Sequence, residues 1–158
     1  MVTSDTSAVA AVEDESMPAP PTNASHGMAP ACGPGGYIRS LEMRIAEGHR
    51  PGSGKVWIRT SHPLTDQHNS TDLARLMGLV DTANGIAARV PPGENSYIFP
   101  NVDLQIHMYR APSGEWLGGL DNKVSFGGAD GIGLTSTVLH DANGPFGRAE
   151  QILTLRKS

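Results

Sequence analysis

Residues 70–89, STDLARLMGLVDTANGIAAR, form the segment of this sequence with the clearest helical period. Asn69 and Ser70 are favourable N-cap residues, and Asp72 lies in the first turn, where the helix dipole favours a carboxylate. Pro91-Pro92-Gly93 ends the pattern. Apolar residues recur at spacings of three and four, which places them on one face: Leu73, Leu76, Met77, Val80, Ala83 and Ala87. We therefore expect one long helix over about residues 70–89.

Segments with the period of two that is typical of strands lie on both sides of this helix. Residues 102–109 alternate most regularly, with Val102, Leu104 and Ile106 on one face. Asn143-Gly144 is a strong hairpin signal. The expected strands span residues 37–47, 55–60, 102–109, 115–126, 132–140 and 146–156. Consecutive hairpins give an antiparallel sheet, and one helix covers one of its faces. The expected class is α+β, a single hotdog in which a curved antiparallel sheet wraps around one long central helix.

The charge of the chain is unevenly distributed. The 158 residues carry a net charge of -4, and residues 1–36 contain four acidic residues and no Lys or Arg. This segment is rich in Ala, Pro and Ser, so we expect a disordered acidic tail ahead of a folded domain at residues 37–158. The domain has no basic excess to attract nucleic acid, and no apolar run is long enough to span a membrane. Because the tail lacks the features of a secretory signal, we expect a cytoplasmic location.

Several common site types are excluded by residue spacing. Cys32 is the single cysteine, and the six histidines form no HxH or HxxxH pair, so we expect no metal. Gly52-Ser53-Gly54-Lys55 lacks the first glycine and the final hydroxyl residue of a phosphate loop. The glycines between residues 127 and 133 do not fit the dinucleotide fingerprint, and no Gly-x-Ser-x-Gly run occurs. We therefore expect neither a cofactor nor a serine-hydrolase triad.

Three polar residues occupy unusual positions in this pattern. Asp81 falls in the middle of the expected helix, Asn101 at the entrance of the next strand, and Gln151 within the last strand. Each also has an ordinary structural explanation, as a solvated Asp, a turn Asn and a strand Gln that faces water. Strand parity places Asn101 on the face opposite Val102, so convergence of the three side chains requires sheet curvature or a bulge.

The runs FPNVDLQIHMYR, APSGEWLG, DGIGLTSTVLHD and GPFGRAEQ resemble the thioesterase-like superfamily, specifically the second hotdog of double-hotdog acyl-CoA thioesterases. The resemblance spans about residues 37–156, and its most specific parts are residues 110–116 and 147–151. It implies that an Asp, a Thr or Ser and a Gln orient a water for attack on a thioester. These roles fall on Asp81, Asn101 and Gln151, with Asn in place of the hydroxyl residue. The implied function is hydrolysis of an acyl thioester of coenzyme A or of a carrier protein.

The resemblance also bears on the oligomeric state, and two hypotheses stand beside hydrolysis. The enzymes it resembles carry two hotdogs in one chain, whereas this chain has room for one, so we expect a homodimer to replace the missing half. A second hypothesis is a non-hydrolytic hotdog protein that binds a polyketide-like intermediate and assists its cyclisation or elimination. A third is a structural or partner-binding protein, which predicts that Asp81, Asn101 and Gln151 lie far apart.

Overall fold

The computed structural model describes residues 17–20, 22, 36–65, 70–90, 97–116, 119–126 and 130–157. Most of the segment predicted to be a disordered tail, residues 1–36, lies outside the described residues. Within its described part, the carbonyl of Pro18 accepts a 2.8 Å hydrogen bond from the indole N–H of Trp57. Trp57 is buried, so this segment contacts the folded domain at that point.

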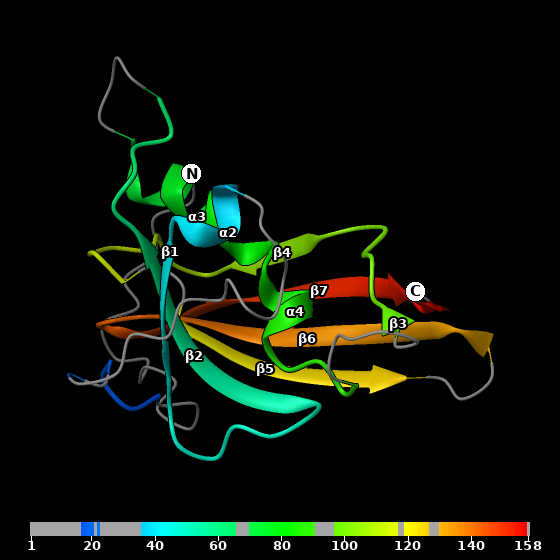
Figure 1. Cartoon of the computed structure of the whole chain (residues 1–158). Helices are drawn as coiled ribbons and strands as arrows, with labels where there is room; N and C mark the ends of the chain where they lie inside the picture. Colours follow the sequence, from blue (N-terminus) through cyan, green and yellow to red (C-terminus); the bar gives the residue numbers. More distant parts are fainter. Residues whose placement is uncertain are drawn as a thin grey trace.

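The domain is built on a six-stranded antiparallel sheet with the strand order β1-β2-β5-β6-β7-β4. The sheet curves, and the helices lie over one of its faces (Figure 1). The turn at Asn143-Gly144 joins β6 to β7, which confirms the predicted hairpin, and Gly144 has the positive φ of 105° that such turns require. The strands are β1 (Leu41–Ile45), β2 (Ser53–Thr60), β4 (Gln105–Met108), β5 (Gly119–Phe126), β6 (Ile132–Asp141) and β7 (Gly144–Thr154), with β3 (Tyr97–Ile98) and β8 (Arg156–Lys157) in a separate two-stranded sheet.

The prediction of one long helix over residues 70–89 is wrong, because the segment forms two short helices, α3 (Asp72–Val80) and α4 (Ala83–Ile86). Thr71, instead of Ser70, is the N-cap, and its hydroxyl accepts a hydrogen bond from the Ala74 N–H, whereas Asn69 lies outside the described residues. At the other end, the Thr82 hydroxyl donates to the Leu79 carbonyl at 2.6 Å. A hydroxyl bond of this kind competes with the helical hydrogen bonds. The break therefore falls at Asp81 and Thr82.

Three other expectations need correction. Tyr37 lies in a short helix, α2 (Gly36–Arg39), and not in the first strand. Leu73 and Met77 were expected on the buried face of the helix, but they are 44% and 40% exposed. The strand expected over residues 102–109 is shorter, because regular pairing with β7 covers only Gln105–Met108.

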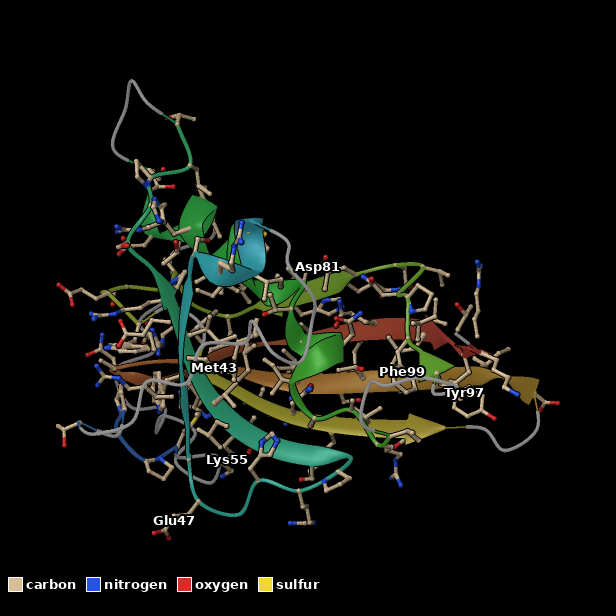
Figure 2. All side chains as sticks on the ribbon, in the orientation of Figure 1. Met43, Glu47, Lys55, Asp81, Tyr97 and Phe99 are labelled. Atoms are coloured by element: carbon tan, nitrogen blue, oxygen red, sulfur yellow. The ribbon has the colours of Figure 1, made fainter. Side chains whose placement is uncertain are left out.

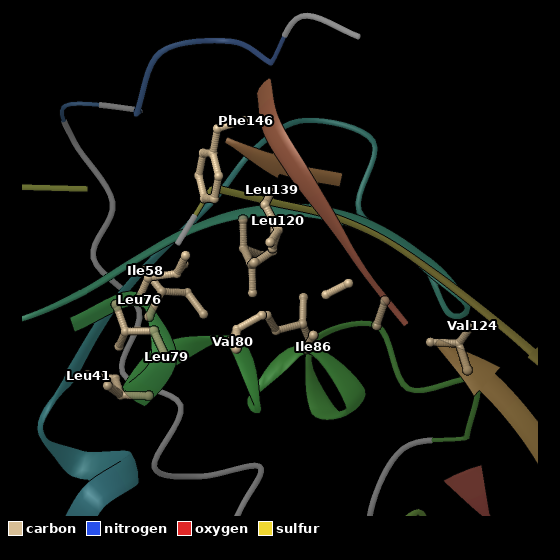
Figure 3. Packing of buried hydrophobic residues seen from close by; sticks show 14 of the residues in the cluster. Leu41, Ile58, Leu76, Leu79, Val80, Ile86, Leu120, Val124, Leu139 and Phe146 are labelled. Atoms are coloured by element: carbon tan, nitrogen blue, oxygen red, sulfur yellow. The ribbon is translucent and has the colours of Figure 1, made fainter. Parts of the chain in front are cut away.

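The hydrophobic core lies between the curved sheet and the two helices, as Figure 3 shows. Its side chains come from α3, α4 and the inner face of the sheet, and the largest include Ile58, Leu76, Leu79, Leu120, Leu139, Phe146 and Leu153. The same inner face also carries four buried polar residues, Asn122, Thr135, Thr137 and Gln151. Asn122 pairs with Thr137 across β5 and β6, and Thr135 pairs with Gln151 across β6 and β7. A polar strip thus crosses the core beneath the helix break.

The Arg110–Trp116 segment, which carried much of the resemblance, has a structural role. The Arg110 guanidinium donates to both carboxylate oxygens of Asp141, at 2.6 and 2.8 Å, and the Ser113 N–H adds a third bond. Burial opposes ionisation of Asp141, but the bonds from Arg110 and from two backbone N–H groups keep the pKa of its carboxyl below the usual value. The Trp116 ring lies 4.5 Å from Arg44 and 4.6 Å from Arg59. The segment therefore joins the β6–β7 hairpin to β1 and β2.

Candidate active site

The structure brings Asp81, Asn101 and Gln151 together at the helix break. The Asn101 amide nitrogen donates to Asp81 Oδ1 at 2.7 Å, and the Gln151 amide nitrogen donates to the same oxygen at 3.2 Å. The Gln151 amide also lies 3.4 Å from the Asp81 backbone carbonyl. Asp81 follows the last residue of α3, on the side of the sheet that carries the helices (Figure 2). The third hypothesis of the sequence, which required these side chains to lie far apart, is therefore wrong on this point.

A shift in strand register explains why Asn101 reaches Asp81. Gln105 pairs with Glu150 in the regular ladder between β4 and β7, and Asn101 pairs with Leu153 in an isolated bridge. Asn101 precedes Gln105 by four positions, but their partners on β7, Leu153 and Glu150, are only three positions apart. The extra residue changes the face of the sheet to which a side chain belongs. Asn101 thus leaves the face predicted by simple alternation and joins the face of Gln151.

Backbone hydrogen bonds fix the segment that carries Asn101. The Thr154 N–H donates to the Pro100 carbonyl, and the Val102 N–H donates to the Ile152 carbonyl, each at 2.9 Å. The Asn84 side chain, from α4, donates to the Phe99 carbonyl at 3.1 Å. The segment before β4 is therefore attached both to β7 and to the helix that follows Asp81.

The buried polar strip of the sheet is hydrogen-bonded to the start of α4, just after Asp81. The Asn122 amide donates to the Ala83 carbonyl, and its own carbonyl oxygen accepts a 2.7 Å bond from the Thr137 hydroxyl. These bonds attach the start of α4, two residues after Asp81, to the middle of the sheet. The sequence reasoning missed Asn122, although it shares the alternating pattern of Leu120 and Val124 and so belongs on the apolar face. An amide on such a face needs hydrogen-bond partners, and that requirement was the available signal.

The site is closed on the side of the sheet and open to solvent on the side of the helix break. Gln151 is 1% exposed and forms its floor, whereas Asp81 is exposed and Asn101 is half-buried. Both side-chain bonds to the Asp81 carboxylate fall on Oδ1, and no described residue donates to Oδ2. Tyr37 lies close enough for the Asp81 charge to act on it. Burial, and then the negative charge of Asp81, raise the pKa of the Tyr37 phenol.

Among the described residues, no group of three or more His, Cys, Asp or Glu side chains gathers in a way that a metal ion requires. The described helices include none that is long and apolar enough to cross a membrane.

A curved antiparallel sheet packed on short helices is typical of the hotdog class of folds, and the helix break carries a carboxylate and two amides. Residues 6–155 match the family described as acyl-CoA thioesterase C-terminal domain, and the chain belongs to that family. This confirms the predicted resemblance to the second hotdog of the double-hotdog enzymes.

The solved structure of acyl-CoA thioesterase II TesB2 from Mycobacterium marinum has the same fold, with a TM-score of 0.54 and 19% sequence identity. The match covers 94% of this chain and 58% of that one. The chain therefore spans a little over half the length of TesB2. No curated protein matches the sequence.

The influence of Asp81 on Tyr37 gives a first test of the site geometry. Asp81→Asn removes the negative charge that disfavours tyrosinate, so the pKa of Tyr37 is expected to fall, while burial still holds it above the ordinary value. The measurement is ultraviolet titration of tyrosinate, with Tyr37→Phe to assign the signal. Glu47→Gln, a change of charge in an exposed turn, is expected to leave the titration unchanged. An unaltered Tyr37 titration in Asp81→Asn contradicts the geometry.

Proposed function

We propose that this chain hydrolyses an acyl thioester with a water molecule oriented by Asp81, Asn101 and Gln151. The observation that supports the proposal most strongly is the meeting of two amide donors on one carboxylate oxygen at the helix break. The bonds to Oδ1 orient the carboxylate, so that Oδ2 can accept a proton from water. Membership of an acyl-CoA thioesterase family supports coenzyme A as the carrier of the acyl group.

The proposed reaction needs no covalent intermediate. Asp81 accepts a proton from the water as the water oxygen attacks the thioester carbonyl carbon. The carbonyl oxygen becomes an oxyanion, and the second N–H of the Asn101 amide can donate to it. When the carbon–sulfur bond breaks, the thiolate leaves and receives the proton that Asp81 accepted from the water, which returns Asp81 to the carboxylate form. The products are a free acid and a thiol, which balances the water consumed.

Asn101 favours a second candidate function, because the resemblance implies a hydroxyl residue at this position. An amide keeps an acceptor and adds donors, so it binds a carbonyl oxygen as readily as a water. A protein that binds a polyketide-like intermediate and assists cyclisation or elimination is therefore the alternative. The two functions differ in their products, since only hydrolysis releases a free acid together with the thiol.

We also propose that a second copy of the chain pairs along β4. This strand is one edge of the sheet, and Met108 and Tyr109 at its end are 42% and 62% exposed. The opposite edge, β1, carries Glu42 in ion pairs with Arg44 and Arg59. Charged side chains protect an edge from pairing, and β4 has none within its bounds. Because Asn101 lies just before β4, such a partner would border the candidate site.

The hydrolase proposal is tested by thiol release from a panel of acyl-CoA substrates. Asp81→Asn removes the group that accepts the proton and is expected to lower kcat by about 100-fold or more. Asp121→Asn, which changes a surface ion pair with Lys55 at 3.3 Å, is the matched control and is expected to retain the activity of the wild type. Absence of thiol release by the wild-type chain contradicts hydrolysis, and full activity in Asp81→Asn contradicts the role of Asp81 in it. A changed product without free acid favours the alternative.

The pairing proposal is tested by sedimentation velocity. Met108→Lys places a charge at the exposed end of β4 and is expected to convert a dimer into a monomer. Ile132→Lys changes another exposed apolar residue, 52% exposed at the start of β6, and is expected to remain dimeric. A monomeric wild-type chain, or a Met108→Lys variant that still dimerises, rules out pairing at this edge.

A further inference from the structure

In the part of the chain that the structure describes, two buried polar atoms on the inner face of the sheet have no hydrogen-bond partner. They are the hydroxyl oxygen of Thr135 and the side-chain carbonyl oxygen of Gln151. Their residues are 0% and 1% exposed and lie directly opposite each other in the β6–β7 ladder. Paired residues on one face of an antiparallel ladder have their Cβ atoms about 5 Å apart. Two unpaired groups of complementary chemistry are thus neighbours in the interior.

The orientation of the Gln151 amide follows from its contact with Asp81. A carboxylate oxygen can only accept hydrogen bonds, so the amide nitrogen of Gln151 must face Asp81 Oδ1, and the amide oxygen must face away from it. The opposite orientation would bring two oxygens together. Whatever holds the amide oxygen of Gln151 therefore also determines how the carboxylate of Asp81 is bonded.

Thr135 differs from the other buried threonines of the described residues because its hydroxyl has no hydrogen-bond partner. The Thr82 hydroxyl donates to the Leu79 carbonyl at 2.6 Å, and the Thr137 hydroxyl donates to Asn122 at 2.7 Å. A buried hydroxyl and a buried amide oxygen that lack hydrogen-bond partners each destabilise the folded chain, because they lose their bonds to water without replacement. One water molecule between them accepts from the hydroxyl and donates to the amide oxygen, which satisfies both.

We propose that Thr135 is a positioning residue of this site: through one buried water, its hydroxyl holds the amide oxygen of Gln151 and keeps the Gln151 N–H groups directed at Asp81. The kinetic consequence rests on the proposed hydrolase function, whereas the coupling between Thr135 and Gln151 does not.

The kinetic test uses Thr135→Val, which keeps the shape of the side chain and removes the hydroxyl. We expect kcat to fall about 10-fold or more, because the amide of Gln151 loses its fixed orientation, while KM for the acyl-CoA stays within about twofold. Thr135→Ser restores the hydroxyl and is expected to recover most of kcat. Thr60→Val, the same change on β2, is the matched control and leaves kcat unchanged. A Thr135→Val variant with the kcat of the wild type overturns the proposal.

A thermal-unfolding cycle of Thr135→Val, Gln151→Met and the double variant tests the coupling without reference to activity. With the bridge in place, Thr135→Val lowers Tm by about 3 °C or more, and this loss disappears when Gln151 is already Met. If the Thr135 hydroxyl makes no hydrogen bond, its removal raises Tm or leaves it unchanged, and the Tm shifts of Thr135→Val and Gln151→Met add in the double variant. Additive shifts overturn the proposal even where the chain is an active thioesterase. Non-additive shifts support the coupling even where the chain releases no thiol.

Discussion

The hydrogen bond from the buried Asn122 amide to the Ala83 carbonyl is the constraint on which the candidate site depends. It attaches the start of α4 to the centre of the sheet, while the Thr137 hydroxyl satisfies the other end of the same amide. Three polar groups are thereby paired inside an apolar core, where each would be costly alone. The helix break is fixed above the sheet as a result, and Asp81 projects from that break.

The other two site residues reach Asp81 for a different reason, the register of β7. Gln151 belongs to the inner face because it alternates with Ala149 and Leu153, both of them buried. Asn101 joins that face only because one extra residue separates it from the regular pairing of β4. Bulges of this kind redirect single side chains near functional sites. Asn101 therefore owes its position to an irregularity in the sheet, whereas Gln151 owes its position to the regular ladder.

The sequence predicted the antiparallel sheet, the hairpin at Asn143-Gly144 and the three polar residues that meet in the candidate site, because alternation, turn chemistry and the family resemblance are local signals. It did not predict the break at Asp81, since the apolar period continues from Val80 to Ala83 and Ala87 across it. The break comes from the Thr82 hydroxyl and from the bond between Asn122 and Ala83, and the second of these joins residues far apart in the sequence. The sequence left open whether curvature or a bulge brings Asn101 to the face of Gln151, because the register shift before β4 also depends on contacts between residues far apart in the sequence.

In the proposed reaction Asp81 directs a water and does not itself attack the thioester. A single turnover in ¹⁸O-labelled water, with enzyme in excess over acyl-CoA and mass analysis of the released acid, tests this claim directly. Direct attack by water places one ¹⁸O atom in every molecule of acid formed in that turnover. Acid released without the label would mean that its new oxygen came from the Asp81 carboxylate through a covalent intermediate, and would contradict the account.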